Sequence, residues 1–500
     1  MKRIIIVIAS LLCALTASGQ GATQKYVEQL KTTDELREAV WGIKAVKADG
    51  KVVAEYNSRT RMLPASNLKL ITTGLALRSL GGSYRFTTSI AHSGSIEDGV
   101  LKGDLYIIGG GDPTLGATDP CSVPLQTIFS RWEKDIRDAG VTKVEGRLIG
   151  DGRYLDCDLQ DLSWEIMDAD SGDGAPMTGL SFDRGLQSFT VSPGAAVGER
   201  VKVEPGFPET PWMSWSHTAT TSPQGSGSDL EYLCTPLAPL ASMSGTFPLG
   251  AAPKKLTASN CFGAMTCAYY FYRYLENVGI DVSEGPADIS PLGVIRDFGD
   301  GQDPMPAERQ DALKLLGSSR SAPLLDIVRR TNAVSDNYYA EGLLRALAKE
   351  KSGSACADSC DAVRLACLEK LGVKDASRMR FSDGSGLSRA NYVSPAFMVD
   401  FLLAMNSSPD GESFRGALPQ PGSGTLASRL VREDAATRAR VYMKSGSMGG
   451  VRCYSGYILS SDGDPAGTIA FSILTNNTVA PTSSINFIMD KLIGLMASEN

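Results

Sequence analysis

The sequence predicts an α/β (α+β) protein in which a helix-rich module is interrupted by a long strand-rich insert. Apolar residues recur at helical spacing before about residue 86 and again after about residue 311. Residues 87–310 are instead rich in short strand patterns and turn residues. A chain of 500 residues suggests two to four domains. We therefore expect one module formed by residues 20–86 and 311–500, and an insert of one or two domains between them.

The first segment of the module should hold a helix, an alternating stretch over residues 41–56, and a second helix. The second helix lies in LPASNLKLITTGLALRSLGG, where the apolar residues from Leu68 to Leu80 recur at helical spacing. Gly81 and Gly82 follow directly, and glycine commonly ends a helix. We expect the helix to end there.

The insert should contain many strands and few helices. Strand patterns occur in RFTTSIAHSG, GDLYIIGGGDP, KVEGRLIGDG, LQSFTVSPG and ERVKVEPG, and the two clear helices in SVPLQTIFSRWEKDIRDAG and CFGAMTCAYYFYRYLENVG. Residues 208–229 are rich in Ser, Thr, Pro and Gly and predict a loop. If the insert holds two nested domains, we expect the inner part at about residues 100–185.

The final segment returns to helices and then alternates again in RARVYMKSG, CYSGYILSS and AGTIAFSILTNN. The last helix, SSINFIMDKLIGLMASEN, is amphipathic. It could lie on a membrane surface, but its polar face carries one basic residue, Lys491, so we expect it to pack on the terminal sheet. Membrane contact would then be peripheral at most.

The composition is that of a soluble globular protein with a net charge of −7. This argues against a general nucleic-acid binder, which needs a basic face. Residues 1–19 are typical of a secretory signal, with basic residues before an apolar run and a small-residue site before Gln20. We expect an exported, periplasmic protein cleaved near Gly19 and Gln20.

Nine cysteines follow the leader, an odd number that leaves at least one unpaired. An oxidising compartment permits disulfides, so we expect a few bridges together with buried free thiols. Cys356 and Cys360 have no second pair and no nearby His, and we expect no metal site.

The chemistry points first to Ser66 and Lys69, which form the one Ser-x-x-Lys of the chain. Three residues apart on a helix is about one turn, so the hydroxyl and the amine share a face. A serine hydroxyl needs a base to take its proton, and a lysine can be that base if its pKa is lowered. The chain has two histidines, His92 and His217, and both lie in the insert.

Two further motifs follow in order. Ser335-Asp336-Asn337 stands in a short break between two helical runs, and Lys444-Ser445-Gly446 follows an alternating stretch. We expect a strand to end at Lys444 and to present a cation, a hydroxyl and bare backbone to one ligand. Ser484-Ile485-Asn486 and Lys351-Ser352-Gly353 repeat these patterns, but their order or context fits less well.

Each motif taken alone has an ordinary interpretation: a chance helical pair at Ser66, or a helix cap at Ser335. Gly109-Gly110-Gly111 lacks the final glycine of a phosphate loop and predicts a tight turn. The acids of Asp383–Ser388 are too few for a calcium loop, so we expect this segment to shape the cleft.

The three motifs in this order resemble the signatures of the penicillin-binding proteins and serine β-lactamases. The chain looks most like class C low-molecular-mass penicillin-binding proteins, the D-Ala-D-Ala carboxypeptidase/endopeptidase family (peptidase family S13). That family carries a large insert between the first two motifs, as here. GDLYIIGGGDPTL, NAVSDNYYAE and FSDGSGLSRANYVSP also match it. The one small departure is Ser445, where Thr is usual.

The resemblance implies a transpeptidase/β-lactamase-like fold, an antiparallel sheet flanked by helices, and a set of roles. Ser66 would attack the penultimate D-Ala carbonyl and Lys69 would take its proton. Ser335, tuned by Lys444, would relay a proton to the leaving amine. Asn337 would hold a substrate amide and orient Lys69. Lys444 and Ser445, beside Gly446, would bind the terminal carboxylate. The N–H groups of Ser66 and Ser447 would form the oxyanion hole.

It also implies the function: a serine-type D-Ala-D-Ala carboxypeptidase/endopeptidase that acts on peptidoglycan stem peptides, needs no cofactor, and is inhibited covalently by β-lactams. A serine β-lactamase and a non-catalytic cell-wall binder of the same fold are the alternatives. The long insert argues against the first, and the intact nucleophile and lysines argue against the second.

Overall fold

The structure is a computed structural model that describes residues 21–155, 160–235, 238–289, 294–296 and 305–500. The predicted signal, together with Cys13 and Cys157, lies outside the described residues. None of the helices in this part of the chain has the length and apolar character needed to cross a membrane.

A five-stranded antiparallel sheet joins the two ends of the chain. Its strand order is β2-β1-β24-β23-β22. The bounds are β1 (Val40–Lys47), β2 (Val52–Tyr56), β22 (Val441–Met448), β23 (Val451–Ile458) and β24 (Ile469–Asn476). Because β1 pairs with β24 along its whole length, the chain must return from the insert before this sheet can close.

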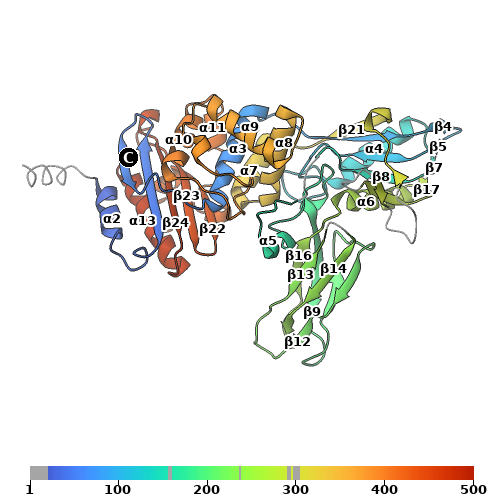
Figure 1. Cartoon of the computed structure of the whole chain (residues 1–500), viewed down its shortest axis with the longest axis horizontal. Coiled ribbons are helices and arrows are strands. Elements are labelled where there is room, and N and C mark those ends of the chain that lie inside the picture. The colour runs from blue at the N-terminus through green and yellow to red at the C-terminus, as the bar shows by residue number, and fades with distance from the viewer. Residues whose placement is uncertain (1–20, 156–159, 236–237, 290–293, 297–304) are drawn as a thin grey trace, which may run out of the picture.

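Both faces of this sheet are buried. Alternate residues of β24 face opposite sides: Phe471 and Ile473 enter the core beneath α13 (Thr482–Ser498) and α2 (Ala22–Leu30), and Leu474 enters the core beneath α10 (Pro395–Asn406). Figure 1 shows α13 and α2 at one side of the sheet, at the outer end of the molecule. The last helix therefore packs on the terminal sheet, as the sequence predicts.

A cluster of helices connects this sheet to the insert. Helix α3 (Leu68–Leu80) lies at its centre and packs against α7 (Leu324–Val334), α8 (Asn337–Ser352) and α9 (Ala357–Lys370). The shorter helices of the module are α11 (Gly411–Arg415), α12 (Ala435–Ala439) and the 3-10 turns η1 (Ala65–Asn67), η4 (Ala376–Arg378), η5 (Gly424–Leu426) and η6 (Pro465–Gly467).

The insert is built on a seven-stranded sheet of order β20-β19-β18-β8-β6-β3-β21. Its strands are β3 (Thr87–His92), β6 (Leu105–Ile108), β8 (Leu148–Asp151), β18 (Pro286–Ile289), β19 (Val294–Arg296), β20 (Met305–Pro306) and β21 (Lys314–Arg320). Since β21 pairs with β3, this unit continues past the expected boundary at residue 310. The two predicted helices are α4 (Leu125–Asp138) and α6 (Gly263–Asn277).

A smaller four-stranded sheet, β17-β7-β5-β4, lies at the far end of the insert. Its strands are β4 (Ser95–Glu97), β5 (Val100–Lys102), β7 (Lys143–Val144) and β17 (Asp281–Val282). The short helical segments of the insert are α5 (Ile166–Asp170), η2 (Asp183–Gly185) and η3 (Gln310–Ala312).

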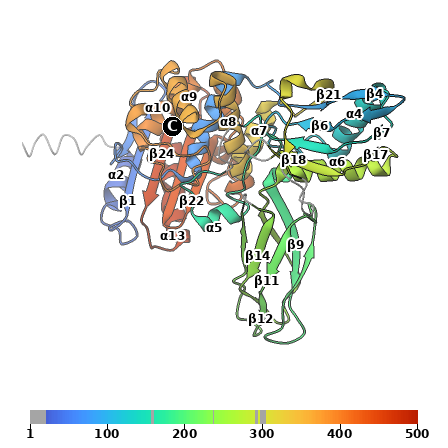
Figure 2. The same ribbon diagram turned by 45° about the vertical axis from the view of Figure 1, so that its right-hand side comes forward.

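A nested lobe over residues 186–259 projects from the rest of the molecule, as Figures 1 and 2 show. Its sheets are β10-β9-β16, β11-β14-β13 and β12-β15. The strands are β9 (Leu186–Ser192), β10 (Lys202–Pro205), β11 (Ser214–His217), β12 (Thr220–Ser222), β13 (Glu231–Cys234), β14 (Leu240–Ser244), β15 (Thr246–Pro248) and β16 (Lys254–Ser259).

Two expectations are corrected here. The inner unit of the insert lies at residues 186–259 rather than at about 100–185, because the strands of 100–185 pair with both ends of the insert: β6 pairs with β3, and β8 pairs with β18. The predicted loop at 208–229 contains β11 and β12. Neither strand has an apolar alternation, and each forms through parallel pairing with a later strand, β14 or β15.

The cysteines also differ from expectation. No disulfide joins any two of the eight cysteines that the structure describes, so the expected bridges are not found among them. The Sγ atoms of Cys234 and Cys261 lie 3.3 Å apart.

Candidate active site

Ser66 lies in the turn η1, directly before helix α3. The helix spans Leu68–Leu80 and ends at Gly81, as predicted. Ser66 thus occupies a 3-10 turn rather than the α-helix itself, and Lys69 follows in the first helical turn. The Nζ atom of Lys69 still reaches the Ser66 Oγ atom at 3.0 Å. Ala65, just before Ser66, has a left-handed φ of 45°, a strain that often accompanies functional turns.

Ser335-Asp336-Asn337 forms the sharp break between α7 and α8 that the sequence predicts. Ser335 caps the end of α7 in a left-handed conformation, and Asp336 is the N-cap of α8. The Asn337 side chain at the start of α8 accepts a hydrogen bond from Lys69 Nζ at 2.6 Å. The second motif therefore meets the first, although more than half of the sequence separates them.

Lys444 brings the third motif to the same place. Its Nζ donates to Ser335 Oγ at 2.9 Å and to the Ser445 carbonyl at 2.8 Å. The prediction of a strand end here is wrong: β22 runs on to Met448 and turns into β23 through Gly449-Gly450. A two-glycine hairpin suits the left-handed backbone of such a turn, and Gly450 has a φ of 72°.

Gly446 allows β22 to lie directly against the turn that carries Ser66. A Cβ atom at this position would stand 2.7 Å from the Pro64 carbonyl oxygen and 3.1 Å from the Asn67 nitrogen. Beside it, Ser445 Oγ donates to Thr425 Oγ1 at 2.9 Å, and Ser447 is exposed. The structure thus brings all eight predicted site residues together. They lie on the turn η1, the first turn of α3, the break between α7 and α8, and strand β22.

Both lysines are fully buried, and burial disfavours the charged form of an amine. Burial lowers the pKa of Lys69 to about 8, against nearby carboxylates that oppose this shift, first Asp383 and then Glu341. Burial, and then the positive charge of Lys69, hold the pKa of Lys444 well below its usual range. The site therefore holds two amines that lose a proton more readily than an exposed lysine does.

Two buried carboxylates lie behind Lys69: Glu341, which the sequence reasoning missed, and Asp383, which it named only as part of the 383–388 segment. Glu341 accepts hydrogen bonds from the backbone N–H groups of Gly384 and Ser385 at 2.9 and 2.7 Å. The Ser385 carbonyl in turn accepts from Lys69 Nζ at 2.7 Å. Burial raises the pKa of Glu341 to about 7. The helical spacing of the sequence could have indicated Glu341, since it follows Asn337 by one helical turn and shares its face.

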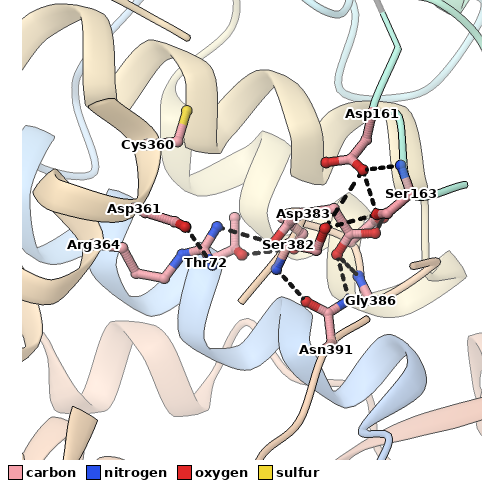
Figure 3. A network of polar contacts seen from close by, with 12 residues as sticks. Thr72, Asp161, Ser163, Cys360, Asp361, Arg364, Ser382, Asp383, Gly386 and Asn391 are labelled. Atoms are coloured by element: carbon pink, nitrogen blue, oxygen red, sulfur yellow. Dashed lines mark hydrogen bonds and ion pairs between the residues drawn. The ribbon is translucent and has the colours of Figure 1, made fainter. Parts of the chain in front are cut away.

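Asp383 is the second of these carboxylates and organises the loop at 383–388. It accepts hydrogen bonds from the N–H groups of Gly386 and Ser388 at 2.8 and 2.7 Å and from the Asn391 side-chain amide at 2.9 Å. Figure 3 shows these contacts converging on Asp383. The segment presents the Ser385 carbonyl to Lys69 Nζ at 2.7 Å, and the expectation that it shapes the cleft stays a prediction.

The loop is also anchored from both sides. Thr72 Oγ1 donates to the Gly384 carbonyl at 2.6 Å, and Arg364 Nη2 donates to the Asp383 carbonyl at 2.9 Å. From the insert, Ser163 Oγ lies 2.6 Å from the hydroxyls of Ser382 and Ser388 (Figure 3). Helices α3 and α9 and the insert therefore hold this loop together.

The remaining candidates stay outside the site. His92 and His217 contact backbone carbonyls in the insert, at Ser93 and Val201. Lys351-Ser352-Gly353 is the end of α8, with Gly353 as its left-handed cap. The glycines at 109–111 form a closely packed turn, since a Cβ on Gly110 would stand 2.0 Å from the Thr87 carbonyl oxygen.

This arrangement supplies the parts of serine acyl transfer: a hydroxyl nucleophile, a buried amine within hydrogen-bond reach, and a second hydroxyl–amine pair beside it. Fold and site together define a serine hydrolase of the penicillin-binding, β-lactamase-like class.

Comparison with known proteins agrees. The chain matches the D-Ala-D-Ala carboxypeptidase 3 (S13) family over residues 23–498, and it belongs to this family of peptidases. It is 30% identical over 481 residues to the D-alanyl-D-alanine carboxypeptidase of Actinomadura sp. (strain R39), covering 93% of this chain and 83% of that protein. It is 24% identical to the D-alanyl-D-alanine carboxypeptidase DacB of Haemophilus influenzae, over 84% of this chain and 82% of that one.

Among solved structures, the fold resembles penicillin-binding protein 4 of Haemophilus influenzae. The TM-score is 0.76, with 21% sequence identity, and the match covers 95% of this chain and 98% of that one. The insert is therefore shared with a related fold rather than being an addition peculiar to this chain.

Proposed function

We propose that this D-Ala-D-Ala carboxypeptidase acts on peptidoglycan stem peptides through an acyl-enzyme on Ser66. One observation carries the proposal: the buried Lys69 amine, with a pKa lowered by burial to about 8, lies 3.0 Å from the Ser66 hydroxyl. A neutral amine at this distance can take the hydroxyl proton as Ser66 attacks the carbonyl of the penultimate D-Ala.

Ser335 and Lys444 complete the proton path. When the tetrahedral intermediate collapses, the leaving D-Ala nitrogen needs a proton. Ser335 can donate one, because its own oxygen is hydrogen-bonded to Lys444 Nζ at 2.9 Å. Water then attacks the acyl-enzyme, and the same groups work in reverse to free Ser66. Asn337 orients Lys69 through its side-chain oxygen.

Substrate binding would use the open edge of β22. The Lys444 amine and the Ser445 hydroxyl lie there, and hydrogen-bond donors of this kind suit the terminal carboxylate of a D-Ala-D-Ala peptide. The backbone N–H groups of Ser66 and Ser447 would hold the oxyanion. A β-lactam carries a carboxylate and a reactive carbonyl in a similar arrangement, so it should acylate Ser66 and act as a covalent inhibitor.

A protein that acts on peptidoglycan must leave the cytoplasm. The sequence pattern of residues 1–19 supports export and a periplasmic location. Amino-terminal sequencing of the mature protein should begin near Gln20.

Labelling with a fluorescent penicillin tests the proposal. We expect one covalent adduct, placed on Ser66 by mass spectrometry, and no label on Ser66→Ala. An adduct on another residue would overturn the assignment of the nucleophile. Incubation with a D-Ala-D-Ala pentapeptide should release D-Ala while penicillin turns over slowly; rapid penicillin hydrolysis without D-Ala release would instead indicate a β-lactamase.

A further inference from the structure

The second motif is held by the insert rather than by its own module alone. Four consecutive residues, 336–339, each hydrogen-bond to a residue of the insert. The contacts are Arg184 Nη1 to Asp336 Oδ2 at 3.1 Å, Asn337 Nδ2 to the Asp173 carbonyl at 3.0 Å, Tyr338 Oη to Ser181 Oγ at 2.7 Å and Tyr339 Oη to Asp119 Oδ2 at 2.6 Å.

Asp336 lies between the two residues that contact the lysines of the site: Ser335 accepts from Lys444, and Asn337 accepts from Lys69. The two oxygens of the Asp336 carboxylate accept different hydrogen bonds. Oδ1 accepts from the Tyr339 N–H at 2.9 Å and caps α8, and Oδ2 accepts from Arg184. The Asp336 side chain is 7% exposed, so water screens this ion pair little. Any movement of Asp336 would move both of its neighbours.

Arg184 itself stands on a strained turn. Asp183 and Arg184 both have left-handed backbone, with φ of 41° and 59°, and Gly185 follows with 62°. Side chains other than glycine rarely take this conformation, and it persists where the surroundings enforce it. A Cβ on Gly185 would stand 3.0 Å from the Tyr338 ring. The turn is therefore pressed directly against the second motif.

The Asn337 amide shows what this contact achieves. The Asp173 carbonyl can only accept, so it holds the amide nitrogen toward the insert. The amide oxygen is then left facing Lys69 Nζ, 2.6 Å away. The insert therefore sets the orientation of the Asn337 side chain, although Lys69, which Asn337 contacts, belongs to the other module.

We propose that the insert positions the second motif for catalysis, and that Arg184 is a positioning residue that acts through Asp336. This assigns the insert a role in the chemical step itself. It rests on the proposed function of Ser66, Lys69 and Ser335. Misplacement of a reacting group by about 1 Å can cost roughly a hundredfold in rate, so a modest loosening of the loop should be measurable.

Arg184→Met tests the proposal. It keeps most of the side-chain length and removes the charge and the hydrogen bond to Asp336. We expect kcat for D-Ala release and the rate constant for penicillin acylation to fall roughly tenfold, with KM little changed. Arg184→Lys should recover part of the loss, because it restores a cation. Arg273→Met is the matched control: this insert residue is 58% exposed in its side chain and pairs with Glu276. It should behave as the parent protein.

A double-mutant cycle separates positioning from a general loss of stability. In an Asp336→Asn background the partner charge is already gone, so adding Arg184→Met should lower kcat little further. The same tenfold loss in that background, or wild-type kcat in Arg184→Met, would overturn the proposal. Covalent labelling of Ser66 in the parent protein is measured alongside; its absence would refute the proposed function instead.

Discussion

Two fully buried charged groups in this protein have opposite surroundings. Asp151, at the end of β8 in the insert, accepts bidentately from Arg153 at 3.0 and 2.8 Å. Lys69, at the centre of the other module, donates to three neutral acceptors: a hydroxyl, an amide oxygen and a backbone carbonyl. Removing one partner of a buried ion pair destabilises a fold, whereas a buried amine with no carboxylate in hydrogen-bond contact gives up its proton more readily. The comparison distinguishes a charge placed for structure from one placed for chemistry.

The largest effect should come from Lys69→Met. This variant keeps the buried volume and removes the proposed base, so penicillin acylation of Ser66 should fall by about 10³-fold, within the range that general bases contribute. Stopped-flow or gel-based labelling measures it, with circular dichroism to check the fold. If the variant acylates at the parental rate, Lys69 is not the base and the comparison with Asp151 fails.

Lys444→Met should have the next largest effect. The variant removes the amine that donates to Ser335 Oγ, so the relay to the leaving group loses its tuning partner. We expect D-Ala release to fall about 10²-fold. Lys351→Met is the matched control, because Lys351 belongs to the other Lys-Ser-Gly of the chain, at the end of α8 and outside the site. It should leave the rate unchanged. Equal losses in both variants would argue against the assignment of Lys444.

The rate should also depend on pH through Lys69. A base with a pKa of about 8 is half protonated at pH 8 and almost wholly protonated at pH 6. The acylation rate should therefore fall on the acid side, by roughly 50-fold between pH 8 and pH 6 if Lys69 alone is the base. A flat profile across this range would contradict the role of Lys69.

Glu341→Gln checks which group is titrating. Asp383, Glu341, Asp336 and Asp173 raise the pKa of Lys69, while burial lowers it. Removing the Glu341 charge should lower the Lys69 pKa and move the acid limb to lower pH, since glutamine can still accept from the Gly384 and Ser385 N–H groups. An acid limb that disappears in this variant would mean that Glu341 itself was the titrating group.

The smallest effect on rate should come from Arg153→Met. This variant leaves the buried Asp151 carboxylate without its bidentate partner, although Gln310 still donates to it at 2.8 Å. We expect a loss of about 1–3 kcal/mol in unfolding free energy. Urea denaturation measures it, with acylation kinetics at a temperature where the protein is folded. Reduced acylation by the folded variant would contradict the assignment of Asp151 to a purely structural role.

Local patterns predicted the local structure well. The helix at Leu68–Leu80, the break at Ser335 and the packing of the last helix follow from spacing, glycine and amphipathicity over a few turns. The nested lobe was misplaced, and β11 and β12 were predicted as loop, because both depend on pairing between distant strands: β8 with β18, β11 with β14 and β12 with β15. Pairing between distant strands depends on the whole fold, and a local pattern does not record it.

The sequence by itself determined which groups could do chemistry: one Ser-x-x-Lys, one Ser-Asp-Asn and one well-placed Lys-Ser-Gly, in an order that indicated a serine peptidase. The tertiary structure decided the surroundings of those groups and, through them, the pKa of Lys69. Burial, which is a property of the packed fold, lowers the pKa of Lys69. Glu341 and Asp383 shape its surroundings, and Arg184 reaches Asp336 from the insert. These effects require segments far apart in the chain to meet, and only the closed fold brings them within hydrogen-bond distance.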